Sequence, residues 1–112
     1  MSYYQEIMKE ISGNMQDLSK DIPAVMKAFS GLVGASTADG ALDKKTKELI
    51  MIGIAVANRC DGCIGFHTKA LVDLGVTEQE LAEALGVAVA MGGGPSVMYA
   101  ANTLKAFKEF AG

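Results

Sequence analysis

Two cysteines and one histidine lie within eight residues of one another. Cys60, Cys63 and His67 occur in the segment Cys-Asp-Gly-Cys-Ile-Gly-Phe-His, and the chain has no other Cys or His. A thiolate attacks oxidised sulfur or peroxide oxygen and also binds metal ions, whereas a neighbouring imidazole moves protons or acts as a ligand. This segment is therefore the first candidate for a reactive site.

A helix that begins near Cys60 would bring the three side chains onto one face. Each residue of an α-helix turns by about 100°, so positions 60, 63 and 67 fall at about 0°, 300° and 340°. The unpaired amides and the dipole at a helix start also favour a thiolate. We expect both sulfurs and the ring to share one pocket, with Arg59 and a protonated His67 adding positive charge.

Three interpretations of this cluster are open: a packed core, a zinc site and a redox dithiol. A structural zinc ion takes four ligands, but only Cys60, Cys63 and His67 are available locally, so the fourth would be a carboxylate. A c-type haem needs His directly after the second Cys, where Ile64 stands instead. In a redox dithiol, one thiolate attacks an oxidised substrate and the other thiol closes the disulfide.

The segments around the motif are predicted to be helices, and no convincing strand is found. Gly31 and Gly34 are expected to end the second helix, and Asp43 to cap the third. Thr77 and Glu80 match a capping box for the fifth. We expect an all-α domain of about six helices, at about 3–18, 23–32, 44–58, 62–74, 77–91 and 95–110, with a loop at 35–42.

The length and charge of the chain predict a single small domain that does not bind nucleic acid. The chain has 112 residues, half of them apolar, and a formal net charge of −3. A chain of this size buries enough surface for a core without disulfide staples. Nucleic-acid binding would require a dense basic face, which this composition lacks.

No membrane span is expected, although residues 84–104 carry no charge. The Gly92-Gly93-Gly94-Pro95 turn in this stretch would break a spanning helix where lipid offers no hydrogen-bond partner. The N-terminal residues lack an apolar leader. We therefore expect a cytoplasmic protein, in which thiols stay reduced and a Cys pair is more often catalytic or metal-binding than structural.

Two helical segments, 49–57 and 81–91, carry more apolar surface than a six-helix monomer covers. Residues 49–57 are apolar on every side, and Glu83 is the only charge in the second segment. A helix that is apolar all round must be buried all round, and a large apolar patch usually meets a partner. We expect self-association into a closed symmetric oligomer.

Glu48 extends the cluster into a longer pattern. Eleven residues separate Glu48 from Cys60-x-x-Cys63-x-x-x-His67, and Gly75 follows eight residues beyond the histidine. Within about residues 41–108 of a single domain spanning 1–112, this pattern resembles the signature of the AhpD-like, or carboxymuconolactone decarboxylase, superfamily. The resemblance implies an all-α fold that assembles as trimers or hexamers. It also implies peroxiredoxin-like reduction of small hydroperoxides, with the disulfide re-reduced by a dithiol or protein reductant.

The resemblance also implies a role for each site residue. Cys63 would attack the peroxide, Cys60 would resolve, and Glu48 and His67 would relay protons. A carboxylate beside a thiol disfavours the thiolate, so Glu48 would act by keeping His67 cationic. Analogy with thioredoxin would instead favour Cys60 as the thiolate, but His67 lies one turn from Cys63 and two turns from Cys60.

One position departs from the family pattern. Some peroxidase members carry His immediately before the second Cys, where this chain has Gly62, so one proton carrier is missing. The family name also implies muconolactone decarboxylation, which needs anion-binding groups, yet Arg59 is the only arginine. The alternatives to a peroxidase are therefore such a decarboxylase and a non-catalytic zinc-binding or redox-sensing helical oligomer. No cofactor is expected, because the Gly92–Gly94 turn lacks the Lys-Ser/Thr of a nucleotide loop.

Overall fold

The computed structural model describes all 112 residues and contains six α-helices and no strand. The expected all-α fold is confirmed. The helices are α1 (Tyr3–Asp21), α2 (Pro23–Thr37), α3 (Lys44–Ala57), α4 (Asp61–Asp73), α5 (Glu78–Gly92) and α6 (Gly94–Ala111).

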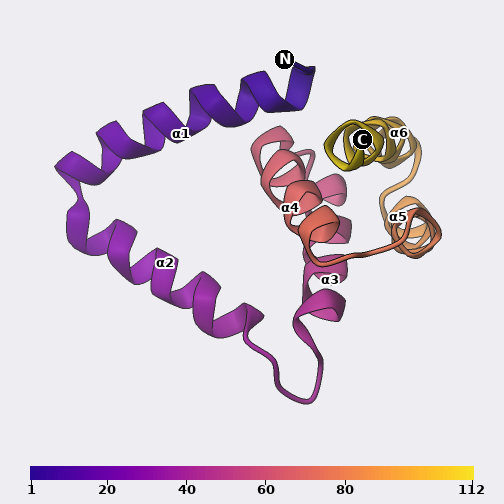
Figure 1. Cartoon of the computed structure of the whole chain (residues 1–112), viewed down its shortest axis with the longest axis horizontal. Helices are drawn as coiled ribbons and strands as arrows, with labels where there is room; N and C mark the ends of the chain where they lie inside the picture. Colours follow the sequence, from indigo (N-terminus) through magenta and orange to yellow (C-terminus); the bar gives the residue numbers. More distant parts are fainter.

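Helices α3 to α6 pack together as a body, and α1 and α2 leave it in a wide V (Figure 1). The N-terminal part of α1 lies against α4, and the chain returns to α3 at the end of α2. The radius of gyration is 14.3 Å, against about 13 Å for a compact domain of this length. The difference agrees with two helices that extend beyond the body.

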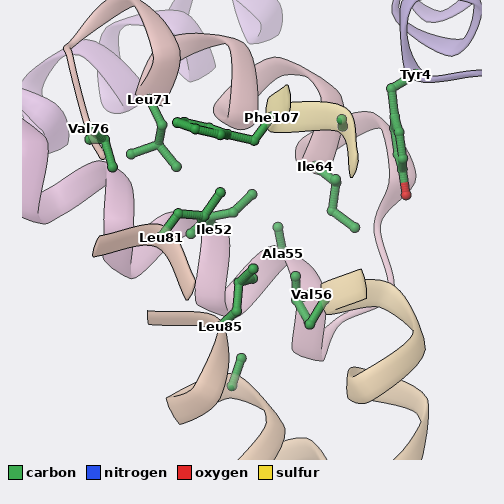
Figure 2. Packing of buried hydrophobic residues seen from close by; sticks show 13 residues of the cluster. Tyr4, Ile52, Ala55, Val56, Ile64, Leu71, Val76, Leu81, Leu85 and Phe107 are labelled. Atoms are coloured by element: carbon green, nitrogen blue, oxygen red, sulfur yellow. The ribbon is translucent and has the colours of Figure 1, made fainter. Parts of the chain in front are cut away.

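The hydrophobic core lies inside the body and fixes α3 against α4. Thirteen buried apolar residues form one cluster (Figure 2), and α2 contributes none of them. Ile52 of α3, Ile64 of α4 and Leu81 of α5 are wholly buried. Tyr4 is the only contribution of α1 to the cluster. The core therefore holds the two helices that carry the motif in a fixed relation.

The predicted end of the second helix is wrong, because α2 continues to Thr37 through Gly31 and Gly34. Neither glycine takes a positive φ, so neither reverses the chain. Glycine inside a helix costs only about 1 kcal/mol relative to alanine. Thr37 is buried and donates its hydroxyl hydrogen to the carbonyl of Val33, which supports the last turn.

The predicted caps of the third and fifth helices are present. Asp43 accepts a hydrogen bond from the Thr46 amide, and Thr77 and Glu80 form a complete capping box. Glu80 also pairs with Lys45 at 2.6 Å, which ties α5 to the start of α3. Gly75 has a φ of 76° in the turn after α4, a conformation that glycine adopts without strain.

The contacts of Glu80 predict a loss of stability in acid. Its hydrogen bond to Lys45, followed by that from the Thr77 amide, lowers the pKa of Glu80 below 4.5. A lowered folded-state pKa stabilises the fold above the unfolded pKa, and this stability is lost as the pH falls through the folded pKa. We expect Glu80→Gln to be less stable than wild type at pH 7 and to approach it below about pH 4.5.

Urea unfolding at a series of pH values measures this difference. Glu83→Gln is the matched control, because it removes a carboxylate from the same helix that bonds only to Gln79. If the difference in unfolding free energy between wild type and Glu80→Gln were the same at pH 7 and pH 3, the prediction would be contradicted.

Candidate active site

Cys60 and Cys63 lie at the first turn of α4 and are joined by a disulfide. Cys60 is the N-cap residue, and its Sγ accepts a hydrogen bond from the Cys63 amide at 3.3 Å. The two Cα atoms are 5.3 Å apart, a separation common among protein disulfides. Cys60 is half-buried, whereas Cys63 is exposed. Cys63 is therefore the more accessible residue of the pair.

The turn between α3 and α4 places Cys60 at the helix start. Arg59 has a φ of 56°, in the left-handed region, which costs a non-glycine residue about 1–2 kcal/mol. The Arg59 amide donates to the carbonyl of Val56 and the Cys60 amide to that of Ala55, so the end of α3 is closed before α4 begins. The short break expected between the third and fourth helices is present. The hydrogen bonds of the Arg59 and Cys60 amides hold it in one conformation.

Glu48 of α3 and His67 of α4 form the second part of the site. Nδ1 of His67 lies 2.6 Å from Oε2 of Glu48. The Glu48 side chain is 6% exposed and that of His67 26% exposed. An ionised carboxylate only accepts hydrogen bonds, so Nδ1 donates its hydrogen to Glu48. When the ring is neutral, Nε2 is then the nitrogen that can accept a proton.

Cys63, His67 and Glu48 lie in order from the surface to the interior. Cys63 and His67 are one turn apart on α4, and residues at this spacing share a helix face. Along this face Cys63 is exposed, His67 is partly buried and Glu48 behind it is buried. With Cys60 bonded to Cys63, the structure brings all four candidate residues onto two adjoining helices.

Tyr4 and Asp61 belong to the same region, although the sequence pattern does not identify them as site residues. The Tyr4 hydroxyl donates to Oδ1 of Asp61 at 3.1 Å, and the Tyr3 hydroxyl reaches Oδ2 at 3.5 Å. Asp61 stands directly after Cys60, inside the CxxC segment. Burial, and then the charge of Asp61, raise the pKa of Tyr4 far above its ordinary 10.0. A contact across 57 residues leaves no local pattern that sequence reasoning could detect.

Two glycines of the motif let α1 lie close against α4. A Cβ atom at Gly65 would be 2.7 Å from Cγ of Met8, and one at Gly62 would be 2.8 Å from Cδ1 of Ile11. Any side chain at these positions would have to displace a residue of α1. The space beside Gly62, where the family pattern allows a histidine, is therefore occupied by Ile11.

The zinc interpretation lacks a ligand set in this arrangement. No three His, Cys, Asp or Glu side chains lie close enough together to hold a metal ion. The two sulfurs are bonded to each other, and the ring nitrogen Nδ1 is hydrogen-bonded to Glu48.

None of the helices combines the length and apolar character needed to cross a bilayer.

Comparison with known proteins gives consistent matches. The family model described as "Carboxymuconolactone decarboxylase family" matches residues 23–106. An uncharacterised protein of Cupriavidus necator is 41% identical over 100 residues, covering 89% of this chain and 88% of the relative. Uncharacterised protein 4 of the cox locus of Paracoccus denitrificans is 33% identical over 105 residues, covering 94% and 95%.

A solved structure has the same architecture. The crystal structure of a carboxymuconolactone decarboxylase family protein from Legionella pneumophila, in its apo form, superposes with a TM-score of 0.94 at 54% sequence identity. The match covers 97% of each chain. The similarity therefore extends over nearly the whole chain, including α1 and the CxxC segment.

Proposed function

We propose that this chain, which belongs to the carboxymuconolactone decarboxylase family, is a dithiol peroxidase that reduces small hydroperoxides. The observation that carries the proposal is the Cys60–Cys63 disulfide at the start of α4, on the helix whose His67 is held by Glu48. A pair that cycles between dithiol and disulfide needs an accessible sulfur, a proton acceptor and a second thiol within bonding reach. These three requirements are met by Cys63, His67 and Cys60.

In the first step, the Cys63 thiolate attacks one oxygen of the hydroperoxide. A sulfur–oxygen bond forms as the oxygen–oxygen bond breaks, so Cys63 becomes a sulfenic acid and the peroxide becomes an alcohol. His67 accepts the thiol proton at Nε2 and returns it to the departing alkoxide. Glu48 supports both transfers by accepting from Nδ1, because it stabilises the imidazolium that exists between them.

In the second step, the Cys60 sulfur attacks the sulfur of Cys63. The disulfide forms and the sulfenic oxygen leaves as water with the proton of Cys60. The 5.3 Å separation of the Cα atoms allows this bond without backbone movement. An external dithiol or a reduced protein then supplies two electrons and two protons, which restores both thiols and forms a disulfide in the reductant.

The assignment of Cys63 as the attacking residue depends on access and on His67. The position of Cys60 at the helix cap favours a thiolate there, since its sulfur accepts the Cys63 amide. Cys63, however, is the more exposed residue and shares its helix face with His67 one turn away. We therefore assign attack to Cys63 and resolution to Cys60.

Single cysteine substitutions test this reaction. We expect wild type to consume hydroperoxide with dithiothreitol as the donor, and both Cys63→Ser and Cys60→Ser to lose turnover. Cys60→Ser should form a sulfenic acid at Cys63 that dimedone labels, because no second thiol remains to resolve it. Labelling in Cys63→Ser alone would reverse the two roles. If peroxide leaves the thiols unchanged, the proposed function is contradicted. If the thiols are oxidised once but peroxide is not consumed catalytically, the result indicates redox sensing instead.

Substitution of Glu48 tests the proton relay. Glu48→Gln keeps the shape of the side chain but removes the charge that stabilises the imidazolium, so we expect peroxide turnover to fall at least about tenfold. His67→Gln should cause a similar loss, and the double variant should lose little more, because the two residues act as one unit. Steady-state peroxide consumption measures the effect, with the exposed Glu78→Gln as control. Unchanged turnover in Glu48→Gln would rule the relay out.

We further propose that copies of this chain assemble through α2. Val25, Phe29 and Leu32 lie on one face of α2 and are exposed, although their spacing is typical of a buried helix face. A groove of about 430 Å³ lies between α3 and α5. Its lining includes Ile50, Ile54, Val87 and Met91, which are exposed in the single chain. The uncharged α2 face of a second copy would fit this groove. In a ring of copies, the α2 face of each neighbour would cover the groove of the next.

Sedimentation velocity tests the assembly. We expect wild type to sediment as a trimer or hexamer at micromolar concentration. Phe29→Glu on α2 and Ile54→Glu in the groove should each dissociate it, because each places a charge in an apolar contact. Lys27→Glu, on the same helix but polar already, is the control. A monomeric wild type would contradict the proposed interface.

A further inference from the structure

Asp61 places a negative charge where the proposed reaction least favours one. It follows Cys60 directly and precedes Cys63 by two residues. A carboxylate near a thiol disfavours the thiolate, and the thiolate is the reactive form. Neither reaction step described above uses Asp61. The residues that contact it should therefore explain how the motif accommodates it.

Both oxygens of Asp61 are occupied by hydroxyl groups from α1. Tyr4 donates to Oδ1 at 3.1 Å and Tyr3 to Oδ2 at 3.5 Å. The two tyrosines differ in their setting, because Tyr4 is 4% exposed and Tyr3 is 62% exposed. Water can replace the Tyr3 hydroxyl, whereas the buried Tyr4 offers a fixed donor. Figure 2 shows the Tyr4 ring at the edge of the buried cluster.

The position of Tyr4 is determined by the packing of α1 on α4. Met8 lies against Gly65, and a Cβ atom at Gly65 would also lie 3.6 Å from the backbone oxygen of Tyr4. The raised pKa of Tyr4, caused first by burial, keeps its hydroxyl protonated at neutral pH. Tyr4 is therefore a permanent donor aimed at Asp61.

We propose that Tyr4 is a positioning residue for the dithiol: its hydroxyl holds the Asp61 carboxylate and offsets its charge, so that the thiolate of the reduced pair forms more readily. This inference rests on the proposed function only in requiring that Cys60 and Cys63 cycle between disulfide and dithiol. Tyr4 contacts neither sulfur in any step and acts through Asp61.

Other charged and titratable groups lie near the motif or near Tyr3 and Tyr4, and none of them bonds to Asp61. They are Glu48 of α3, Arg59 in the preceding turn, His67 of α4, and Tyr99, Lys105 and Glu109 of α6. Glu48 and His67 bond to each other, and the only hydrogen bonds to the Asp61 carboxylate come from Tyr3 and Tyr4. Substitutions at Tyr4 and Asp61 therefore address this one contact.

The proposal predicts that substitutions of Tyr4 and of Asp61 have opposite effects on thiolate formation. Tyr4→Phe removes the donor but keeps the ring in the core, so the Asp61 charge acts more strongly on the sulfurs. Asp61→Asn removes the charge itself. A role limited to tethering α1 would shift both variants in the same direction, because either substitution weakens the same contact.

The pH profile of thiol alkylation is the measurement. Fully reduced protein is treated with iodoacetamide over a range of pH, and the midpoint of the rate profile reports thiolate formation. We expect Tyr4→Phe to raise the midpoint by about half to one pH unit, which is about a three- to tenfold loss of thiolate below it. Asp61→Asn should lower the midpoint. Tyr3→Phe is the matched control and should change it less.

A second readout separates this proposal from the peroxidase activity. Each protein is equilibrated with a fixed ratio of reduced to oxidised glutathione at pH 8.5, where thiolate contributes to the dithiol state. Two glutathione thiols reduce the disulfide and become one glutathione disulfide. Acid quenching and mass spectrometry then give the dithiol fraction. It should fall in Tyr4→Phe and rise in Asp61→Asn.

The double variant Tyr4→Phe with Asp61→Asn completes the test. It should match Asp61→Asn alone in both readouts, since the donor has no charge left to offset. Shifts of the same sign in the two single variants, or no shift in Tyr4→Phe, would overturn the proposal. Neither readout uses peroxide, so opposite shifts would uphold the role of Tyr4 even in a protein without peroxide turnover.

Discussion

The hydrogen bond between Glu48 and His67 is the contact on which the rest of the site depends. A carboxylate as buried as Glu48 is costly unless it is paired, and the nearest partner is Nδ1 of His67 at 2.6 Å. The pair can form only if α3 and α4 keep one relative position. The wholly buried Ile52 and Ile64 and the closed turn at Arg59 impose that position. The hydrophobic core thus determines the chemistry by fixing two helices.

The change in burial along the site gives each group a different environment. Glu48 is shielded from water, so its orientation toward the ring is stable and its hydrogen bond is strong. His67 is partly exposed and can exchange protons with a bound molecule. Cys63 is exposed. From Glu48 of α3 through His67 to Cys63 of α4, the side chains therefore pass from the interior to the surface.

The sequence predicts the local features of this protein and misses most of the long-range ones. The spacing of Cys63 and His67 and the capping box at Thr77 depend on neighbours within one turn, which a helix pattern describes fully. The contact of Glu48 with His67 crosses two helices, and only the resemblance to a family indicated it. The single chain leaves part of the apolar segment 49–57 uncovered, as its sequence predicts: Ile54 is 55% exposed.

The same long-range packing determines what surrounds position 62, where this chain has glycine. Glycine there and at Gly65 admits α1, and α1 brings the hydroxyl of Tyr4 to Asp61. A larger side chain at Gly62 would require Cδ1 of Ile11, the end of its side chain, to move. A proton carrier between the cysteines and a close-packed α1 are therefore competing uses of one space. Under the proposed function, His67 with Glu48 would move protons, and α1 would offset the charge beside the sulfurs.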